Sequence, residues 1–230
     1  MFKIVSWNIQ QGGGSRITKI LNTIRTYDAT VVVYSEFHNN KSGDHLRQGM
    51  QNLGYKHAFF TGALDALNTV AIFSKIACGS SIFPKCDEKF PHAMLRLEFD
   101  IFDIYGVYFP HKKKHSLFPY LIDEELSKGK PSIIAGDYNS GINGLDQKGT
   151  SFWYSEFLIK MQENGYLDAF RLKHGDIKEY SWYSHQGNGF RYDHTYVSES
   201  LSPIVHDCYY DHIAREHKYA DHSPMILELA

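Results

Sequence analysis

Short hydrophobic runs alternate along the chain with segments of helical periodicity. Residues 2–8 alternate apolar and polar positions, which predicts a short strand. Residues 17–24 then repeat isoleucine and leucine at helical spacing. Residues 30–36 (TVVVYSE) are apolar on both faces, as expected of a buried strand. This order of strand, helix and strand indicates an α/β protein.

The same patterns place the remaining elements. Helices are expected at about 42–53, 117–126 and 157–164, and strands at about 56–60, 69–74, 93–99, 101–108, 131–137, 180–183, 192–197 and 224–229. No repeat or Pro/Gly/Ser-rich linker divides the sequence, so residues 1–230 are expected to form a single domain. The predicted fold class is α/β, with two sheets packed face to face as a β-sandwich flanked by helices.

Several of the apolar strands end abruptly in a polar side chain. These residues are Asn8, Glu36, Tyr108 and Asp137, with Asn139 two positions further on. A single carboxylate at a strand end is ordinarily solvated and idle. Four strands that end this way are more informative, because ligands in α/β proteins bind where loops gather at the carboxyl ends of strands. Glu, Asp and Asn oxygens without cysteine suit Mg²⁺ or Mn²⁺ better than zinc.

A second polar group precedes the last predicted strand. Asp221 and His222 stand in the segment ADHSP, and an isolated Asp-His of this kind is most often a surface turn. In the company of the strand-end residues, Asp221 could complete a metal shell, and His222 could bind or protonate an anionic group.

Composition excludes some classes of protein. A formal net charge of −2 excludes a uniformly basic nucleic-acid binder. The 3 cysteines form no CxxC pair, so neither a disulfide framework nor a zinc ribbon is expected, and a reducing compartment is the natural interpretation. No apolar run approaches the roughly 18 residues of a membrane span. No secretory signal is visible, so we expect a cytoplasmic protein without a membrane partner.

Beyond these features, nine segments of the chain resemble one family when taken in order. They are WNI (7–9), Glu36, NTVAIFSK (68–75), IYGVYFPH (104–111), GDYNS (136–140), LDAFR (167–171), YSWY (180–183), RYDHTYVS (191–198) and ADHSP (220–224). Each is weak alone, but together they resemble the endonuclease/exonuclease/phosphatase superfamily, and within it the exonuclease III and abasic-site endonuclease branch. The resemblance implies a four-layer α/β sandwich of the deoxyribonuclease I-like type.

The resemblance also implies roles for the polar residues. Glu36 would be the principal metal ligand, and Asp137 would position or deprotonate the attacking water. His222 would donate to a non-bridging phosphate oxygen, with Asp193 accepting from its other ring nitrogen. Tyr108 would contact the phosphate or the leaving group. The residues implied in the metal site are Asn8, Glu36, Asp137, Asn139, Asp221 and His222.

Substrate contacts are less well marked in the sequence. Trp182 matches an aromatic residue that packs against the deoxyribose in this branch, although a core aromatic is the alternative. The basic run Lys112, Lys113 and Lys114 is ordinarily a solvated helix entrance, but beside an inferred phosphate site we favour contact with a nucleic-acid backbone. For His111, phosphate contact and a solvated loop are equally open.

The sequence departs from the pattern of the family at a few positions. Serine precedes Glu36 where glutamine is usual, and we expect no consequence. His194 follows Asp193 where an apolar or aromatic residue is common, and a packed or hydrogen-bonded histidine is expected there. The segment at about 141–150 looks abbreviated, which leaves the substrate preference open.

The expected function is Mg²⁺-dependent hydrolysis of DNA phosphodiester bonds, with Mn²⁺ able to substitute. Abasic-site endonuclease and 3′-end processing are the expected activities, on duplex DNA, by a monomer. One alternative keeps the metal site but acts on RNA, a small molecule or a lipid headgroup. A catalytically dead binding module on the same fold is a second alternative.

Overall fold

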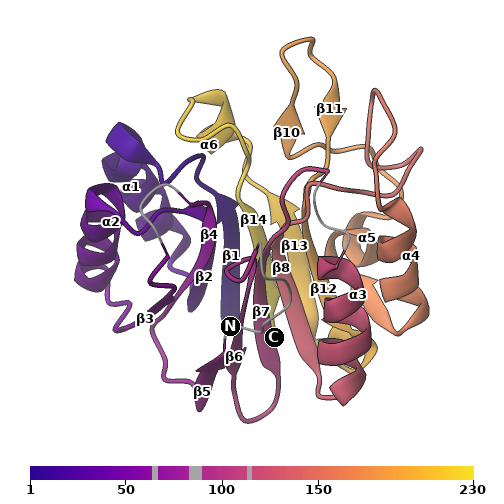
Figure 1. Ribbon diagram of the computed structural model, residues 1–230, viewed down its shortest axis with the longest axis horizontal. Helices are drawn as coiled ribbons and strands as arrows, with labels where there is room; N and C mark the ends of the chain where they lie inside the picture. Colours follow the sequence, from indigo (N-terminus) through magenta and orange to yellow (C-terminus); the bar gives the residue numbers. More distant parts are fainter. Residues whose placement is uncertain (64–66, 83–89, 113–115) are drawn as a thin grey trace.

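In the computed structural model, which describes residues 1–63, 67–82, 90–112 and 116–230, two six-stranded sheets face each other (Figure 1). The first sheet runs in the order β13 (Val205–Tyr210), β14 (Met225–Leu229), β1 (Phe2–Asn8), β2 (Val31–Phe37), β4 (Thr69–Ser74), β3 (His57–Phe60). The second runs β5 (Ser80–Ile82), β6 (Met94–Glu98), β7 (Asp103–Tyr108), β8 (Ser132–Asp137), β12 (Asp193–Ser198), β9 (Tyr166–Asp168). In the centre of each sheet one pair is parallel, β1 with β2 and β7 with β8.

Helices cover the outer faces of both sheets (Figure 1). The first sheet carries α1 (Ile17–Tyr27), α2 (Lys41–Asn52) and α6 (Ile213–Glu216). The second carries α3 (Leu117–Pro119), a π-helical turn (Tyr120–Glu125), a 3-10 turn (Leu126–Lys128) and α4 (Ser155–Glu163). α5 (Ala169–His174) packs against β12 and β13, and further 3-10 turns cover Gly14–Arg16 and Glu199–Ile204. A hairpin of β10 (Trp182–Tyr183) and β11 (Gly189–Phe190) projects from one end of the sandwich.

The main core lies between the two sheets, because each strand turns alternate side chains inward. Val33 of β2 and Ile104 of β7 are fully buried in this layer, while Tyr34 of β2 packs under the helices. Gly106 of β7 brings the sheets close together, since a Cβ atom there would lie 2.8 Å from a side-chain carbon of Val70 and 2.9 Å from one of Val33. Burying one aliphatic side chain of this layer, such as Val33 or Ile104, contributes about 1.5–3 kcal/mol to the stability of the fold.

The predicted α/β sandwich is confirmed, but several elements differ from the predictions, and the short elements β5, β9, β11, α5 and α6 were not predicted. The helix expected at about 117–126 is broken into a short helix, a π turn and a 3-10 turn, and the carboxylate of Glu125 turns inward to Arg96 at 2.8 Å. β13 was not predicted, because a bulge between Val205 and Asp207 breaks its alternation of buried and exposed residues.

Among the described residues, no helix is both long enough and apolar enough to cross a bilayer.

Candidate active site

The polar residues at the strand ends meet at one rim of the sandwich. Asn8 ends β1 beside β2, and Tyr108 ends β7 directly opposite Asp137, the last residue of β8. Asp193 opens β12 and pairs with Asp137 from the other side. Because the two central pairs are parallel, their carboxyl ends fall together, and residues more than a hundred positions apart become neighbours.

Asp137 is the centre of the hydrogen-bonded group. Its side chain is completely buried and accepts from Asn8 Nδ2 at 2.8 Å, from the Asn139 amide at 2.7 Å and from Asn139 Nδ2 at 3.0 Å. Asn139 curls back to reach it because its backbone is left-handed, with φ +46°. Gly136 is required next to it, since a Cβ atom there would lie 1.9 Å from the Val107 carbonyl oxygen.

The electrostatic environment of Asp137 favours proton exchange near neutral pH. Burial, with a smaller contribution from the nearby Asp193 carboxylate, raises the pKa of Asp137 to about 7, and the His222 cation and the amide donors oppose the shift. A carboxylate with a pKa near the working pH is suited to general-base chemistry.

His222 and Asp193 form a buried pair beside Asp137. The Nδ1 atom of His222 lies 2.7 Å from Asp193 Oδ2, and the His222 carbonyl accepts from Trp7 Nε1 at 3.0 Å. Burial disfavours the charge on the ring, but the Asp193 carboxylate, with help from Asp137, raises the pKa of His222 to about 10. The ring is therefore a cation at neutral pH, and its Nε2–H can donate to an anion.

Glu36 stands at a bulge in β2 with a left-handed backbone, φ +58°. Its Oε1 accepts from Asn8 Nδ2 at 3.2 Å, and its Oε2 accepts from the Gln11 amide at 2.7 Å. The Gly12 amide donates to the Glu36 carbonyl at 2.7 Å, so the loop that contains Gly12, Gly13 and Gly14 packs directly against this residue.

Asp221 belongs to the same rim. Its Oδ2 accepts from Trp182 Nε1 at 3.3 Å. Burial lowers the pKa of Arg16, and the carboxylates of Asp221 and Glu36 oppose that shift, so one guanidinium lies in the field of both. The structure thus brings the predicted residues of β1, β2, β7, β8 and β12 together with the loop before β14.

Two buried carboxylate oxygens at this rim lack a donor. Asp193 Oδ1 and Asp221 Oδ1 accept no hydrogen bond from any residue in the described part of the chain. One ligand atom each of Asp137, Asp193 and His222 lie within 4.8 Å of one another. Leaving a buried oxygen unpaired is costly, and a cation supplies the missing partner. The carboxylate oxygens at this rim therefore fit a divalent metal ion, and the protonated His222 ring lies beside them as a hydrogen-bond donor.

Two residues of the site were not assigned a role from the sequence. Asn68 Nδ2 donates to the Tyr108 hydroxyl at 3.2 Å, and His38 Nε2 lies 2.6 Å from Asn68 Oδ1. Burial, and then the charges of Glu36 and Asp137, raise the pKa of Tyr108 well above its ordinary range, so its hydroxyl keeps its proton. The available signal was Asn68 itself, the first residue of the NTVAIFSK segment.

A cavity of about 440 Å³ opens beside these polar residues. Residues that line it include His111, Lys112, Asn139, Trp153, Trp182 and Tyr192. The ring of Trp182 lies 5.5 Å from that of Tyr192, and Lys112 Nζ lies 5.5 Å from the centre of the exposed Trp153 ring. The ring centres of His111 and Tyr192 lie 6.4 Å apart in a T-shaped arrangement. Lys113 and Lys114 lie outside the described residues.

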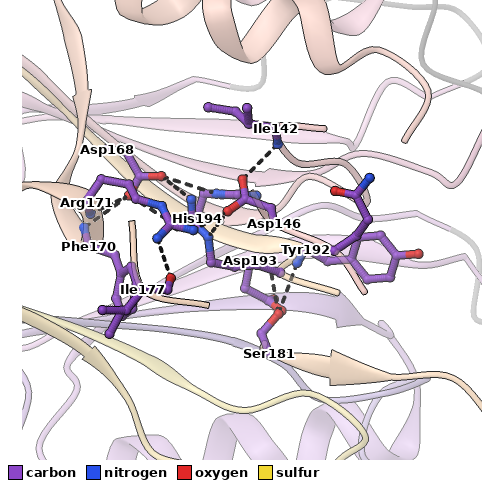
Figure 2. A network of polar contacts seen from close by, with 12 residues as sticks. Ile142, Asp146, Asp168, Phe170, Arg171, Ile177, Ser181, Tyr192, Asp193 and His194 are labelled. Atoms are coloured by element: carbon purple, nitrogen blue, oxygen red, sulfur yellow. Dashed lines mark hydrogen bonds and ion pairs between the residues drawn. The ribbon is translucent and has the colours of Figure 1, made fainter. Parts of the chain in front are cut away.

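Behind the site, a buried ion-pair network holds the start of β12 (Figure 2). Arg191 is fully buried and contacts Asp146 Oδ1 at 2.8 Å and Asp168 Oδ2 at 2.5 Å. The Ser181 hydroxyl accepts from the Tyr192 amide at 3.1 Å and from the Asp193 amide at 3.3 Å, as Figure 2 shows. The carboxylate of Asp193 is thereby fixed against its histidine.

His194 lies in the same network, and its environment agrees with what the sequence predicts. It is completely buried, and its Nε2 lies 2.9 Å from the Ser140 carbonyl oxygen. It is thus a hydrogen-bonded core histidine.

A model of the Endonuclease/Exonuclease/phosphatase family matches residues 5–222. The chain belongs to this family. The family is metal-dependent, and the protein is a hydrolytic phosphodiesterase, so the predicted family and enzyme class are confirmed.

Similar proteins extend over the whole chain. An exodeoxyribonuclease of Streptococcus pneumoniae serotype 4 is 23% identical, over 99% of each chain. Among solved structures, a 3′–5′ exonuclease from Neisseria meningitidis has a TM-score of 0.86 at 19% identity, covering 99% of both chains. An AP endonuclease from Archaeoglobus fulgidus has a TM-score of 0.83 at 21% identity, covering 100% of this chain and 99% of the other. At these identities, the structural likeness shows that this family member shares their fold.

Proposed function

We propose that this phosphodiesterase is a Mg²⁺-dependent hydrolase of DNA that acts at abasic sites, at 3′ ends, or at both. The observation that carries the proposal is the contact of the buried Asp137 carboxylate with Asn8 and Asn139, next to the His222–Asp193 pair. This arrangement joins a base with a pKa near 7 to a cationic donor, as phosphodiester hydrolysis requires.

The protein groups then have distinct tasks. Asp137 accepts a proton from the attacking water, and Asn139 holds that carboxylate in place. His222 donates to a non-bridging oxygen of the phosphate, and Asp193 keeps its ring charged and oriented. Tyr108 donates to the phosphate or to the leaving oxygen.

The metal site is proposed to consist of Glu36 with Asn8 and Asp221, close to Asp137, Asn139 and His222. The unpaired Asp221 oxygen supports a cation there, and oxygen ligands favour Mg²⁺, with Mn²⁺ as a substitute. A bound divalent ion would offset negative charge that develops on the phosphate.

DNA is the proposed substrate because of the aromatic cavity beside Asn139 and because of the relatives. A 3′ phosphatase from Neisseria bound to a product DNA hairpin has a TM-score of 0.84 at 18% identity, covering 100% of both chains. The Trp182 ring would pack against the sugar next to the scissile phosphate, and Lys112 and His111 would contact the backbone. The exposed Trp153 offers a surface for a base, a contact worth about 1–3 kcal/mol in other proteins.

Cleavage of defined DNA tests this function. Duplexes with an abasic site, a 3′-phosphate or a recessed 3′ end, and a single strand, are incubated with Mg²⁺ or with EDTA. We expect cleavage that EDTA abolishes, and no cleavage by Asp137→Asn. The exposed Asp176→Asn is the matched control and should cleave like wild type. If the wild-type protein cleaves none of the four DNA substrates, or if its cleavage resists EDTA, the proposal is contradicted.

Competition separates DNA from the alternatives. If RNA, a phosphorylated small molecule or a lipid headgroup is hydrolysed in preference to DNA in a mixed assay, the same site serves that substrate instead. A dead binding module predicts that Asp137→Asn changes no measurable behaviour. The single domain over residues 1–230, the monomeric state and the cytoplasmic location stay predictions.

A further inference from the structure

Beside Tyr108 lies a hydrogen-bonded pair of side chains, His38 and Asn68, that has no role in the proposed catalysis. Asn68 Nδ2 donates to the Tyr108 hydroxyl oxygen at 3.2 Å. His38 Nε2 in turn lies 2.6 Å from Asn68 Oδ1. The chain of contacts runs from His38 through the Asn68 amide to Tyr108, the residue proposed to donate to the phosphate.

The fold fixes both members of this pair. His38 follows β2 and Asn68 precedes β4, and the adjoining residues Phe37 and Thr69 are paired across the sheet. Thr69 Oγ1 also donates to the Phe37 carbonyl at 2.9 Å. Gly12, at φ +69°, packs against His38 so closely that a Cβ atom there would lie 2.8 Å from the His38 Cβ. The pair is therefore held from two sides by backbone.

The chemistry of the atoms fixes which side chain donates and which accepts in each of these two hydrogen bonds. An amide oxygen only accepts, so His38 Nε2 carries a proton and donates to Asn68 Oδ1. The amide NH₂ group must then face Tyr108, whose oxygen accepts from it. The tyrosine's own proton is directed away from Asn68. A flipped amide would instead present its oxygen and compete with the substrate for that proton.

We propose that His38 and Asn68 are positioning residues, which keep the Tyr108 hydroxyl oriented as a donor to the phosphate or leaving oxygen. This inference rests on the role of Tyr108 in the proposed function. It predicts an effect on the chemical step more than on binding, because neither side chain needs to touch the substrate.

His92 provides a matched control. It lines the same hollow of about 480 Å³ as His38, Asn68 and Tyr108, and its Nδ1 lies 2.6 Å from Thr61 Oγ1. Like His38, it is a histidine bonded to a neighbouring polar side chain, but within the described residues it has no hydrogen bond to Tyr108.

A double-mutant cycle tests the proposal. The values of kcat and KM are measured with Mg²⁺ for wild type, Asn68→Ala, Tyr108→Phe and the double variant. The substrates are a labelled duplex with a recessed 3′ end and bis(p-nitrophenyl) phosphate. We expect Asn68→Ala to lower kcat about tenfold with little change in KM, and to have no further effect when Tyr108 is already phenylalanine. His92→Ala should stay within about twofold of wild type.

Asn68→Asp is the second variant, and it also decides the case if Asn68→Ala fails to fold. An aspartate at position 68 accepts hydrogen bonds from both His38 and Tyr108. The Tyr108 hydroxyl then donates to the aspartate and not to the substrate, so kcat should fall to the level of Tyr108→Phe. Equal losses for Asn68→Ala in the wild-type and Tyr108→Phe backgrounds, or wild-type activity for Asn68→Asp, would overturn the proposal.

A measurement without catalysis keeps the inference separate from the proposed function. The ¹⁵N chemical shifts of the His38 ring should show the tautomer protonated at Nε2, and Asn68→Ala should shift the ring toward a mixture. An Nε2 atom without a proton would overturn the inference whatever the enzyme cleaves. Hydrolysis of the nitrophenyl diester without DNA cleavage would reject only the DNA substrate.

Discussion

Asp137 is the residue at which stability and activity oppose each other. Its carboxylate is buried next to Asp193, and its pKa lies near 7, so the folded protein resists the ionised form. The unfolded chain ionises the same group at about pH 4. Across the interval between these values, the native state loses stability as the pH rises.

This opposition predicts a pH-dependent effect of Asp137→Asn on the free energy of unfolding. Between pH 4.5 and pH 8, the difference between variant and wild type should move in favour of the variant by roughly 1–3 kcal/mol. Urea denaturation in EDTA at both pH values measures it. A difference that stays constant with pH would show that Asp137 is already ionised at pH 4.5.

The pH dependence of kcat should follow the two titrating groups. Activity rises as Asp137 loses its proton near pH 7 and falls as His222 loses its proton near pH 10. The Asp193 carboxylate raises both pKa values, so Asp193→Asn should move both limbs of the profile to lower pH. If Asp193→Asn leaves both limbs of the profile in place at saturating Mg²⁺, these assignments are wrong.

At the scale of elements, Ser35 is the clearest example of a residue that couples the two sheets. Its hydroxyl lies on β2, donates to the Val107 carbonyl of β7 at 3.1 Å and accepts from the Asp137 amide of β8 at 3.3 Å. These contacts tie the strand ends together beneath the site.

Ser35→Ala should therefore destabilise the protein by about 1–3 kcal/mol, because two buried backbone groups lose their side-chain partner. It should also lower activity, since the carbonyl and the amide lie beside Tyr108 and Asp137. Thermal denaturation and DNA cleavage are measured together. Ser202→Ala, whose hydroxyl contact is exposed, is the control and should change stability by less than about 0.5 kcal/mol.

At the scale of the whole molecule, the buried network around Arg191 connects distant segments of the second sheet. It joins the loop at Asp146, the end of β9 at Asp168 and the first turn of α5 at Arg171 (Figure 2). Burial would raise the pKa of Asp168, but Arg191 and His194 lower it well below its ordinary range, and Asp146 shifts the same way. The network thus stabilises the ionised carboxylates.

Arg191→Met should cost about 3–5 kcal/mol of unfolding free energy at pH 7, because the buried Asp168 loses its guanidinium partner and the buried Asp146 keeps only Arg171. The depressed pKa values contribute stability above about pH 4, which is lost as the pH falls below it. The gap between variant and wild type should therefore narrow in acid. Arg25→Met, on the exposed face of α1, is the control. A gap that widens below pH 4 would contradict this account.

The sequence by itself determined the local elements and the kinds of chemistry available. Side-chain periodicity predicted most strands and helices, because the pattern of burial follows the repeat of the backbone. Strand-end positions identified Asn8, Glu36 and Asp137 as candidates. Where buried and exposed positions do not alternate regularly, as at the bulge of β13, the pattern failed.

Only the tertiary structure decided which of these residues meet. Asn8 and Asp137 are 129 positions apart, and the parallel pairs at the centres of two facing sheets bring their side chains to 2.8 Å. The supporting contacts of Ser35, His38 and Asn68 also depend on neighbours from other strands. Local pattern carries no information about such neighbours, because sheet order and register are set by packing across the whole core.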